Sequence, residues 1–230
     1  DVIYLGKDIL SPSAENPAEY YEAKKRGLLL VHIDEEGGAY PGAEDTWRRY
    51  LLWRLDPSKI RPEDYLCTWG DFQTEYYKEA GAKCDVRTTG HPRFDLCRPR
   101  FRAYYDDAVA QIRGKYKDFV LVNTNCTLIF NPVGPGHTFS EANGYIASDD
   151  KKRMTLVSTW ARHCRTAAAM VQLVHQLTIK RPDINFVIRP HPAEDETFYH
   201  AAFGGVSNVH VVRDGSANAW TCAARAMIHS

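Results

Sequence analysis

The segment NFVIRPHPAED (Asn185–Asp195) changes within a few residues from an apolar run to the rigid, cationic turn Arg189-Pro190-His191-Pro192. Arg189 offers a planar, bidentate donor for a phosphate, and His191 adds a further N–H donor. The prolines fix φ, so the turn is rigid before a ligand binds. Pro192 also suits the first turn of a following helix, whose N-terminus attracts anions. The pattern predicts an anion site, and its alternative is a rigid strand-to-helix turn with a solvated arginine.

A second polar cluster follows the apolar run Leu28–Ile33. Asp34, Glu35 and Glu36 place three carboxylates side by side, and like charges this close raise the pKa of at least one of them. Such a carboxylate can act as a general acid or base, or as a nucleophile at a sugar carbon. Gly37 would let a ligand approach the backbone. The alternatives are a solvated acidic turn, a helix cap or a metal site, the last without further ligands at recognisable spacing.

The segment TTGHPRFDL (Thr88–Leu96) is a second rigid turn with an arginine. His91 or Arg93 is expected to face the substrate from the N-terminal half. In the alternative, Asp95 pairs with Arg93 and only shapes the loop.

Two weaker signals come from amides and from the end of the chain. Asn123 and Asn125, in the segment NTNC, offer amide groups for a ribose, a base or a sugar. His229 and Ser230 follow the last apolar run, and both can donate a hydrogen bond to a phosphate.

Short apolar runs alternate with longer helical patterns, which is typical of βαβ units and a parallel sheet. The continuous runs LLLVHI and FVLVN predict strands covered on both faces. Strands are predicted at Val2–Leu5, Leu28–Ile33, Tyr65–Thr68, Asp85–Thr88, Phe119–Asn123, Asn185–Ile188, Val209–Val212 and Ala226–Ile228. Helices are predicted at Pro17–Arg26, Asp45–Arg54, Phe72–Ala80, Phe101–Tyr116, Leu156–Lys180, Glu194–Ala202 and Ala217–Ala224.

The fold class is therefore α/β, with two Rossmann-like parallel-sheet halves. Residues 1–98 form the N-terminal half, residues 99–117 a bridging helix and residues 118–230 the C-terminal half. Both ends of the chain read as strands, so we expect a piece of a longer protein with a truncated C-terminal half. Because ligands bind outside the carboxyl ends of strands in open α/β sheets, the polar turns are expected to converge on one cleft between the halves.

The composition narrows the function classes. Lys plus Arg and Asp plus Glu are balanced at 29 each, so no overall field favours nucleic acid or an anionic membrane. Six scattered cysteines without a C-x-x-C pair predict reduced, mostly buried thiols in a reducing compartment. No apolar run approaches about 18 residues, so no transmembrane segment is predicted. We expect a cytoplasmic protein, compatible with peripheral association at the inner face of the membrane.

The segment Thr127–Arg153 contains glycines and prolines and has little periodicity. Its length predicts either a mobile flap over a ligand or plain disorder.

Taken in order, the segments HIDEEGG, TTGHPRFDL, NTN, IRPHPAED and the terminal IHS resemble those of bacterial surface-carbohydrate biosynthesis proteins. The resemblance runs from about residue 28 to the end. It implies a GT-B-type glycosyltransferase of capsule or lipopolysaccharide assembly, similar to the β-Kdo transferases. Glu35-Glu36-Gly37 would correspond to their acidic-glycine turn, and His191-Pro192 to their His-Pro element near the CMP phosphate. The chain departs from this family pattern in two respects. The relatives have Asp beside the glycine, where this chain has Glu36. A GT-B domain is also expected to continue beyond the last residue.

This resemblance implies transfer of a sugar, an acidic ulosonic acid, from a CMP-activated or other cytidine-nucleotide donor to a glycan or glycolipid acceptor. No metal or cofactor is implied. The N-terminal half would supply the catalytic carboxylate, Glu36 or Glu35 with Asp34 beside them, and would bind substrate through Gly37, His91 and Arg93. The nucleotide would be bound by Arg189, His191, Pro192, Asn123, Asn125, His229 and Ser230.

The sequence is also compatible with three other function classes. A CDP-glycerol glycerophosphotransferase shares the Arg-Pro-His-Pro segment and would use a histidine such as His91 as its base. A nucleotide-sugar 2-epimerase shares the fold and would turn over its donor without an acceptor. A non-catalytic nucleotide-sugar-binding scaffold protein would bind the nucleotide and show no turnover.

Overall fold

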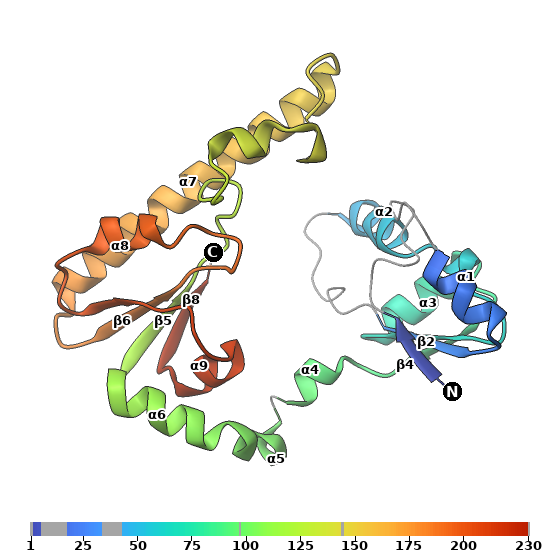
Figure 1. Cartoon of the computed structure of the whole chain (residues 1–230), viewed down its shortest axis with the longest axis horizontal. Helices are drawn as coiled ribbons and strands as arrows, with labels where there is room; N and C mark the ends of the chain where they lie inside the picture. Colours follow the sequence, from blue (N-terminus) through green and yellow to red (C-terminus); the bar gives the residue numbers. More distant parts are fainter. Residues whose placement is uncertain (1, 6–17, 34–42, 97, 144, 230) are drawn as a thin grey trace. The chain divides into compact units, whose positions relative to one another are not determined.

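The computed structural model describes residues 2–5, 18–33, 43–96, 98–143 and 145–229 of the 230-residue chain (Figure 1). The chain forms two compact units, residues 1–101 and residues 102–230. The predicted bridging segment is divided into α5 (Pro99–Arg102), the 3-10 turn η2 (Ala103–Tyr105) and α6 (Asp106–Tyr116). Arg113 of α6 donates to the carbonyl of Ala223 at 3.0 Å, so α6 is part of the second unit.

The first unit is a parallel sheet with helices on one face. Its strands are β1 (Val2–Leu5), β2 (Leu29–Ile33), β3 (Tyr65–Thr68) and β4 (Asp85–Thr88), in the spatial order β1-β2-β3-β4. The other elements are α1 (Ala18–Lys25), α2 (Glu44–Arg54), the 3-10 turn η1 (Pro57–Lys59), α3 (Asp71–Glu79) and α4 (Pro92–Asp95). Because each strand lies beside the one before it, right-handed crossovers bring the helices to the same face.

One apolar core holds this unit together. It joins the three long helices to alternate strand residues, and its members include Tyr20, Leu30, Leu51, Leu66, Tyr77 and Val86. Burial alternates along β2, where Leu30 and His32 are buried while residues 29, 31 and 33 are half-buried. The structure therefore departs from the prediction of a strand buried throughout, because helices α1 to α3 share one face.

A buried ion pair lies at the amino edge of this sheet. The Asp64 carboxylate, whose residue is 1% exposed, accepts from the Lys24 ammonium at 2.7 Å, the Leu30 N–H at 2.9 Å and the Tyr20 hydroxyl at 3.2 Å. Burial raises the pKa of Tyr20 to about 12, so this hydroxyl remains a donor. These contacts tie α1 to β2 and β3 at the edge opposite to the one where ligands bind in such sheets.

The second unit is a parallel sheet of four strands in the order β7-β6-β5-β8. The strands are β5 (Phe119–Asn123), β6 (Asn185–Arg189), β7 (Val209–Val211) and β8 (Ala226–His229). The remaining elements are η3 (Pro135–Phe139), η4 (Glu141–Asn143), α7 (Asp150–Lys180), α8 (Thr197–Phe203) and α9 (Ala217–Ala223). The chain runs outward from β5 to β7 and then returns to place β8 on the other side of β5. The direction of winding therefore reverses between β5 and β8.

Both faces of this sheet are covered, as the sequence predicts for FVLVN. Val122, Phe186 and Ile188 pack with residues of α7 and α8 on one face. Phe119, Leu121 and Val187 pack with residues of α6 and α9 on the other. Figure 1 shows the two pairs of helices on the opposite faces of the sheet. The predicted α/β class with two parallel sheets is confirmed.

Three predicted helix starts are wrong. The first, at Phe101, falls inside α5, and α6 begins at Asp106. Helix α7 begins at Asp150 rather than at Leu156, because the Asp149 carboxylate caps it by accepting from the N–H of Lys152 at 3.0 Å. Helix α8 begins at Thr197 rather than at Glu194, since the Asp195 carboxylate accepts from the N–H of Thr197 at 2.9 Å. Pro192 therefore lies in a loop and not in the first turn of a helix.

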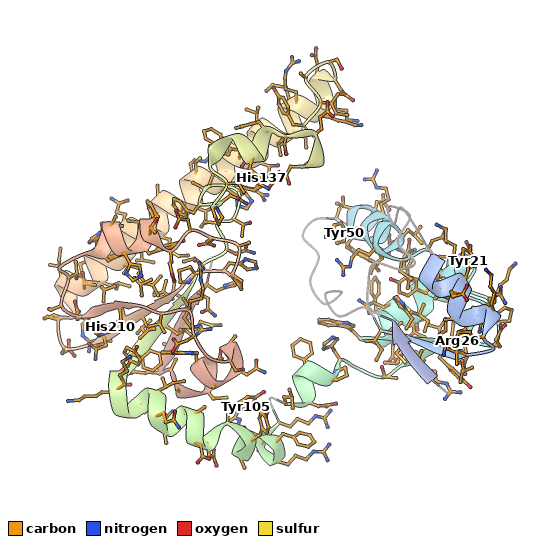
Figure 2. All side chains as sticks on the ribbon, in the orientation of Figure 1. Tyr21, Arg26, Tyr50, Tyr105, His137 and His210 are labelled. Carbon is orange, nitrogen blue, oxygen red and sulfur yellow. The ribbon has the colours of Figure 1, made fainter. Side chains whose placement is uncertain are left out.

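The aperiodic segment 127–153 forms η3, η4 and the start of α7. The rings of Phe139 and Trp160 lie 5.8 Å apart, so the segment packs along the amino-terminal half of α7. Figure 2 shows His137, which belongs to η3, beside that half of the helix. No described helix is long and apolar enough to cross a membrane.

Candidate functional site

Three of the predicted ligand-binding residues end adjacent strands of the second sheet. Asn123, the last residue of β5, is in register with Arg189 of β6 on one side and with His229 of β8 on the other. Register partners in a sheet project from the same face. Leu121 and Val187, two residues earlier on their strands, lie in the core against α6 and α9. Asn123, Arg189 and His229 therefore form one row on that face, at the carboxyl edge.

This row lies where the strand order reverses. In open α/β sheets, ligands bind in the crevice at the carboxyl ends of the strands that flank such a switch point. Here the flanking strands are β5 and β8, which end in Asn123 and His229. The described strands of the first sheet follow one another in simple order, without a reversal.

Arg189 makes several contacts inside the protein. Its Nη1 donates to the Asp214 carbonyl at 2.5 Å, and its Nη2 donates to the carbonyls of Arg213 and Gly215 at 3.3 and 3.1 Å. Its guanidinium carbon lies 5.1 Å from the ring centroid of Trp220, and burial lowers the pKa of the side chain below its ordinary value. An arginine remains charged under such a shift. Arg189 therefore holds the loop between β7 and α9, and its contact with a phosphate stays a prediction.

His191 is exposed and has a defined donor side. Its Nδ1 accepts from the N–H of Ala193 at 3.1 Å. A neutral ring with an accepting Nδ1 carries its proton on Nε2. The Nε2–H is therefore the donor that His191 can offer to an anion. Pro192 beside it is also exposed, whereas Pro190 is buried.

Glu194 is a site residue that the sequence interpretation missed. It is 0% exposed, and its Oε2 accepts from the Thr124 hydroxyl at 2.7 Å and from the Tyr199 hydroxyl at 2.5 Å. Its Oε1 accepts from the N–H of Cys126 at 2.5 Å. Burial, and then the bond to Glu194, raises the pKa of Tyr199 far above its ordinary value, so Tyr199 acts as a donor. One buried carboxylate thus joins the loop after β5 to the loop after β6.

Arg213 links the same loops to the one after β7. Its Nη2 donates to the backbone carbonyl of Glu194, and its Nε lies 3.6 Å from a carboxylate oxygen of Glu196. Since Arg189 donates to the carbonyl of Arg213, each of the three loops is bonded to another. The carboxyl edge of this sheet is therefore preorganised. In the sequence, the only sign of this network is the acidic pair Glu194-Asp195 shortly after His191-Pro192. The sequence analysis placed Glu194 at the start of a helix instead.

His91 of the first unit does not stand open to solvent. It is 6% exposed, and its ring centroid lies 4.5 Å from that of Trp69 and 6.0 Å from that of Phe94. Phe94 is 60% exposed, so this aromatic group lies at the surface of the carboxyl edge of the first sheet. The backbone of Arg93 lies in α4. The side chain of Arg93 lies outside the described part of the chain, as do Asp34, Glu35, Glu36, Gly37 and Ser230.

Hydroxyl groups lock the carboxyl ends of β3 and β4 to α3. The hydroxyl oxygens of Thr68 and Thr74 lie 2.5 Å apart, and those of Thr74 and Thr88 lie 2.8 Å apart. The Thr88 hydroxyl donates to the Asp71 carboxylate at 2.7 Å. These hydroxyl groups satisfy one another's hydrogen bonds, so we assign them a role in the fold rather than in ligand binding.

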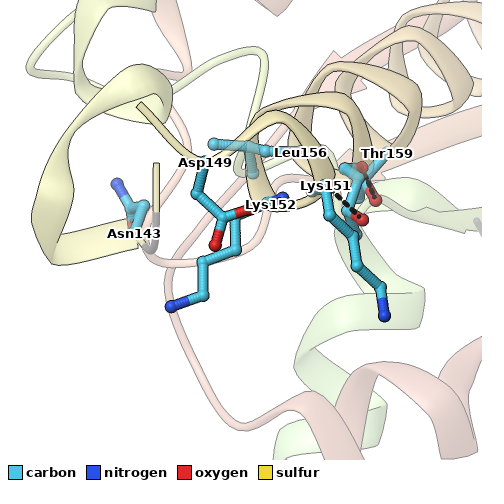
Figure 3. Close-up of a pocket in the computed structure, with 7 residues that line it drawn as sticks. Asn143, Asp149, Lys151, Lys152, Leu156 and Thr159 are labelled. Atoms are coloured by element: carbon cyan, nitrogen blue, oxygen red, sulfur yellow. Dashed lines mark hydrogen bonds between the residues drawn. The ribbon is translucent and has the colours of Figure 1, made fainter. Parts of the chain in front are cut away.

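A pocket of about 390 Å³ lies at the start of α7 (Figure 3). It is lined by Asn143, Asp149, Lys151, Lys152, Thr155, Leu156 and Thr159. It shares no residue with the row at the carboxyl edge. Among the residues that the structure describes, no three His, Cys, Asp or Glu side chains gather in a group that could hold a metal ion.

No family model matches the chain, and no curated protein matches its sequence. The resemblance to surface-carbohydrate biosynthesis proteins therefore stays a prediction. The observations that bear on function independently of it are the row of Asn123, Arg189 and His229 and the bonded loops of the second unit.

Proposed function

We propose that the chain is a GT-B-type glycosyltransferase that moves an acidic ulosonic acid from a CMP-activated donor to a bacterial surface glycan. The observation that carries this proposal is the row of Asn123, Arg189 and His229 at the β5–β8 switch point. Amide, guanidinium and imidazole groups at the carboxyl edge of a Rossmann-like sheet suit the polar groups of a nucleotide.

In this proposal the second unit holds the leaving nucleotide. When the bond between the sugar and the CMP phosphate breaks, negative charge develops on the phosphate oxygens. The Nε2–H of His191 and the ring of His229 would donate to those oxygens, and the positive charge of Arg189 would favour them. The amides of Asn123 and Asn125 would contact the ribose or the base. Because the loops are bonded to one another, these groups would need little rearrangement on binding.

The first unit would supply the carboxylate chemistry. Glu36 or Glu35 would act as nucleophile or base toward the sugar, with Asp34 beside them, and Gly37 would admit the donor. His91 is packed against Trp69. This burial favours glycosyl transfer over a glycerophosphotransferase that needs an accessible histidine base.

The nucleotide preference tests the proposal. In a thermal-shift panel of CMP, CDP, UMP, UDP and GDP, we expect the largest shift with CMP. His229→Ala and Asn125→Ala are expected to reduce that shift, because both side chains are exposed at the switch point. His200→Ala is the matched control, since this exposed histidine lies on α8. A larger shift with a uridine nucleotide, or an equal loss in the control, would count against the assignment.

Turnover separates the remaining classes. With a CMP-activated ulosonic acid, a transferase releases CMP only when a glycan acceptor is present. An epimerase would alter its nucleotide-sugar donor without an acceptor, and a scaffold protein would bind CMP without releasing any product. Glu36→Gln is expected to abolish transfer, whereas loss of turnover in His91→Ala alone would favour the phosphotransferase.

A further inference from the structure

The loop after β5 exposes one residue between two buried ones. Thr124 and Cys126 are 5% and 2% exposed, whereas Asn125 between them is exposed. Both neighbours are bonded to the same side chain. The Thr124 hydroxyl donates to Oε2 of Glu194 at 2.7 Å, and the Cys126 N–H donates to Oε1 at 2.5 Å. The two oxygens of one carboxylate therefore hold the backbone on both sides of Asn125.

Glu194 is itself fixed from two directions. The Tyr199 hydroxyl donates to Oε2 at 2.5 Å, and Arg213 donates to the backbone carbonyl of Glu194. Because Glu194 is 0% exposed, it cannot touch a ligand at the sheet edge. Any effect of this residue on binding must pass through the loop that it holds.

We propose that Glu194 is a positioning residue that presents Asn125 at the β5–β8 switch point in a conformation ready for the nucleotide. The inference rests on the proposed function and adds to it the device that orders the binding loop. A loop fixed in its bound conformation loses less conformational entropy when the ligand arrives. Without the carboxylate, the N–H of Cys126 and the hydroxyl of Thr124 would need other partners, and Asn125 would move with them.

A double-mutant cycle separates this role from plain stabilisation of the fold. Glu194→Gln keeps the shape of the side chain. Its amide nitrogen must face either the Cys126 N–H, which cannot accept, or the hydroxyls of Thr124 and Tyr199, which would then give up the bonds that they donate to the carboxylate. We expect Glu194→Gln and Asn125→Ala each to weaken CMP binding by about tenfold, and the double variant by about tenfold rather than hundredfold, because both changes act through one side chain. CMP titration calorimetry measures the four dissociation constants. An additive, roughly hundredfold loss, or unchanged binding in Glu194→Gln, would overturn the proposal.

A milder pair of variants covers the case in which Glu194→Gln does not fold. Thr124→Val removes one of the two anchoring bonds and leaves the carboxylate in place. Thr178→Val is its matched control, because Thr178 is also buried in the second unit and donates its hydroxyl to the His175 carbonyl at 2.8 Å, within α7. We expect weaker CMP binding only for Thr124→Val. An equal effect of the two variants would reject the positioning role.

A measurement without ligand keeps the two proposals distinct. Amide hydrogen exchange at Cys126 reports the anchored loop, and exchange at Leu121 and Val187 reports opening of the sheet. In Glu194→Gln we expect exchange at Cys126 to rise several-fold more than at the two sheet amides. An equal rise in the exchange rates at Cys126, Leu121 and Val187 would mean that Glu194 only stabilises the unit. If the wild type binds none of the nucleotides but Cys126 responds as expected, the proposed function fails and the anchoring stands.

Discussion

Replacing Arg189 with alanine tests whether this residue holds the loop between β7 and α9. The change removes hydrogen bonds to the carbonyls of Arg213, Asp214 and Gly215, together with the contact to the Trp220 ring. The indole N–H of Trp220 donates to the Asp214 carbonyl at 2.8 Å, so it stays bonded to the same loop.

The expected loss follows from these contacts. Since the guanidinium is only half-buried, each hydrogen bond contributes about 1 kcal/mol, and the contact with the indole ring about 0.5–1 kcal/mol. Together they amount to about 3–4 kcal/mol of the free energy of unfolding of the second unit. Arg189→Lys is expected to lose most of this, because an ammonium cannot reach three carbonyls as the planar fork does.

Native-state hydrogen exchange at Leu121 and Val187 measures the stability of this unit alone, since both residues lie in its core at 0% exposure. The matched control is Arg181→Ala, which removes an exposed guanidinium paired with Asp183 at 2.7 Å and should cost about 0–1 kcal/mol. If Arg189→Ala loses no more than the control, the structural assignment is refuted. Loss of the CMP shift at unchanged stability would instead place the guanidinium on the phosphate.

Three further predictions concern ionisable side chains that are buried or half-buried. Asp64→Asn should destabilise the first unit by about 3 kcal/mol in urea unfolding, because it removes the buried carboxylate of Lys24 and leaves the exposed Glu63 carboxylate, at 3.1 Å, to balance the ammonium; a loss below about 1 kcal/mol would contradict this. Burial, with a contribution from Lys115, holds the pKa of His210 (Figure 2) below its ordinary 6.5. The fold favours the neutral ring, so wild-type stability should fall between about pH 7 and pH 5 more steeply than that of His210→Phe; parallel profiles would reject the assignment. Burial raises the pKa of Cys84 to about 11, so iodoacetamide at about pH 8 should label the half-buried Cys222 before Cys84; mass spectrometry showing Cys84 labelled before Cys222 would contradict this.

Local patterns predicted most of the strands well. Tyr65–Thr68, Asp85–Thr88 and Phe119–Asn123 begin and end where the sequence places them. Each is a short run with a glycine or an asparagine two residues beyond its end, at Gly70, Gly90 and Asn125, so the change of pattern lies close to the end of the strand. Helix starts were less predictable, because a cap such as Asp149 competes with apolar periodicity as the signal.

The sequence by itself determined the α/β class and the polar residues that end the strands, since both depend on patterns within a few neighbouring residues. Only the tertiary structure decided that β5 lies between β6 and β8, and hence that Asn123, Arg189 and His229 share a row. Strand order depends on how the crossing helices pack, over separations that no local pattern records. For the same reason Glu194 read as an ordinary helical residue, although burial and long-range donors make it the anchor of the loop after β5.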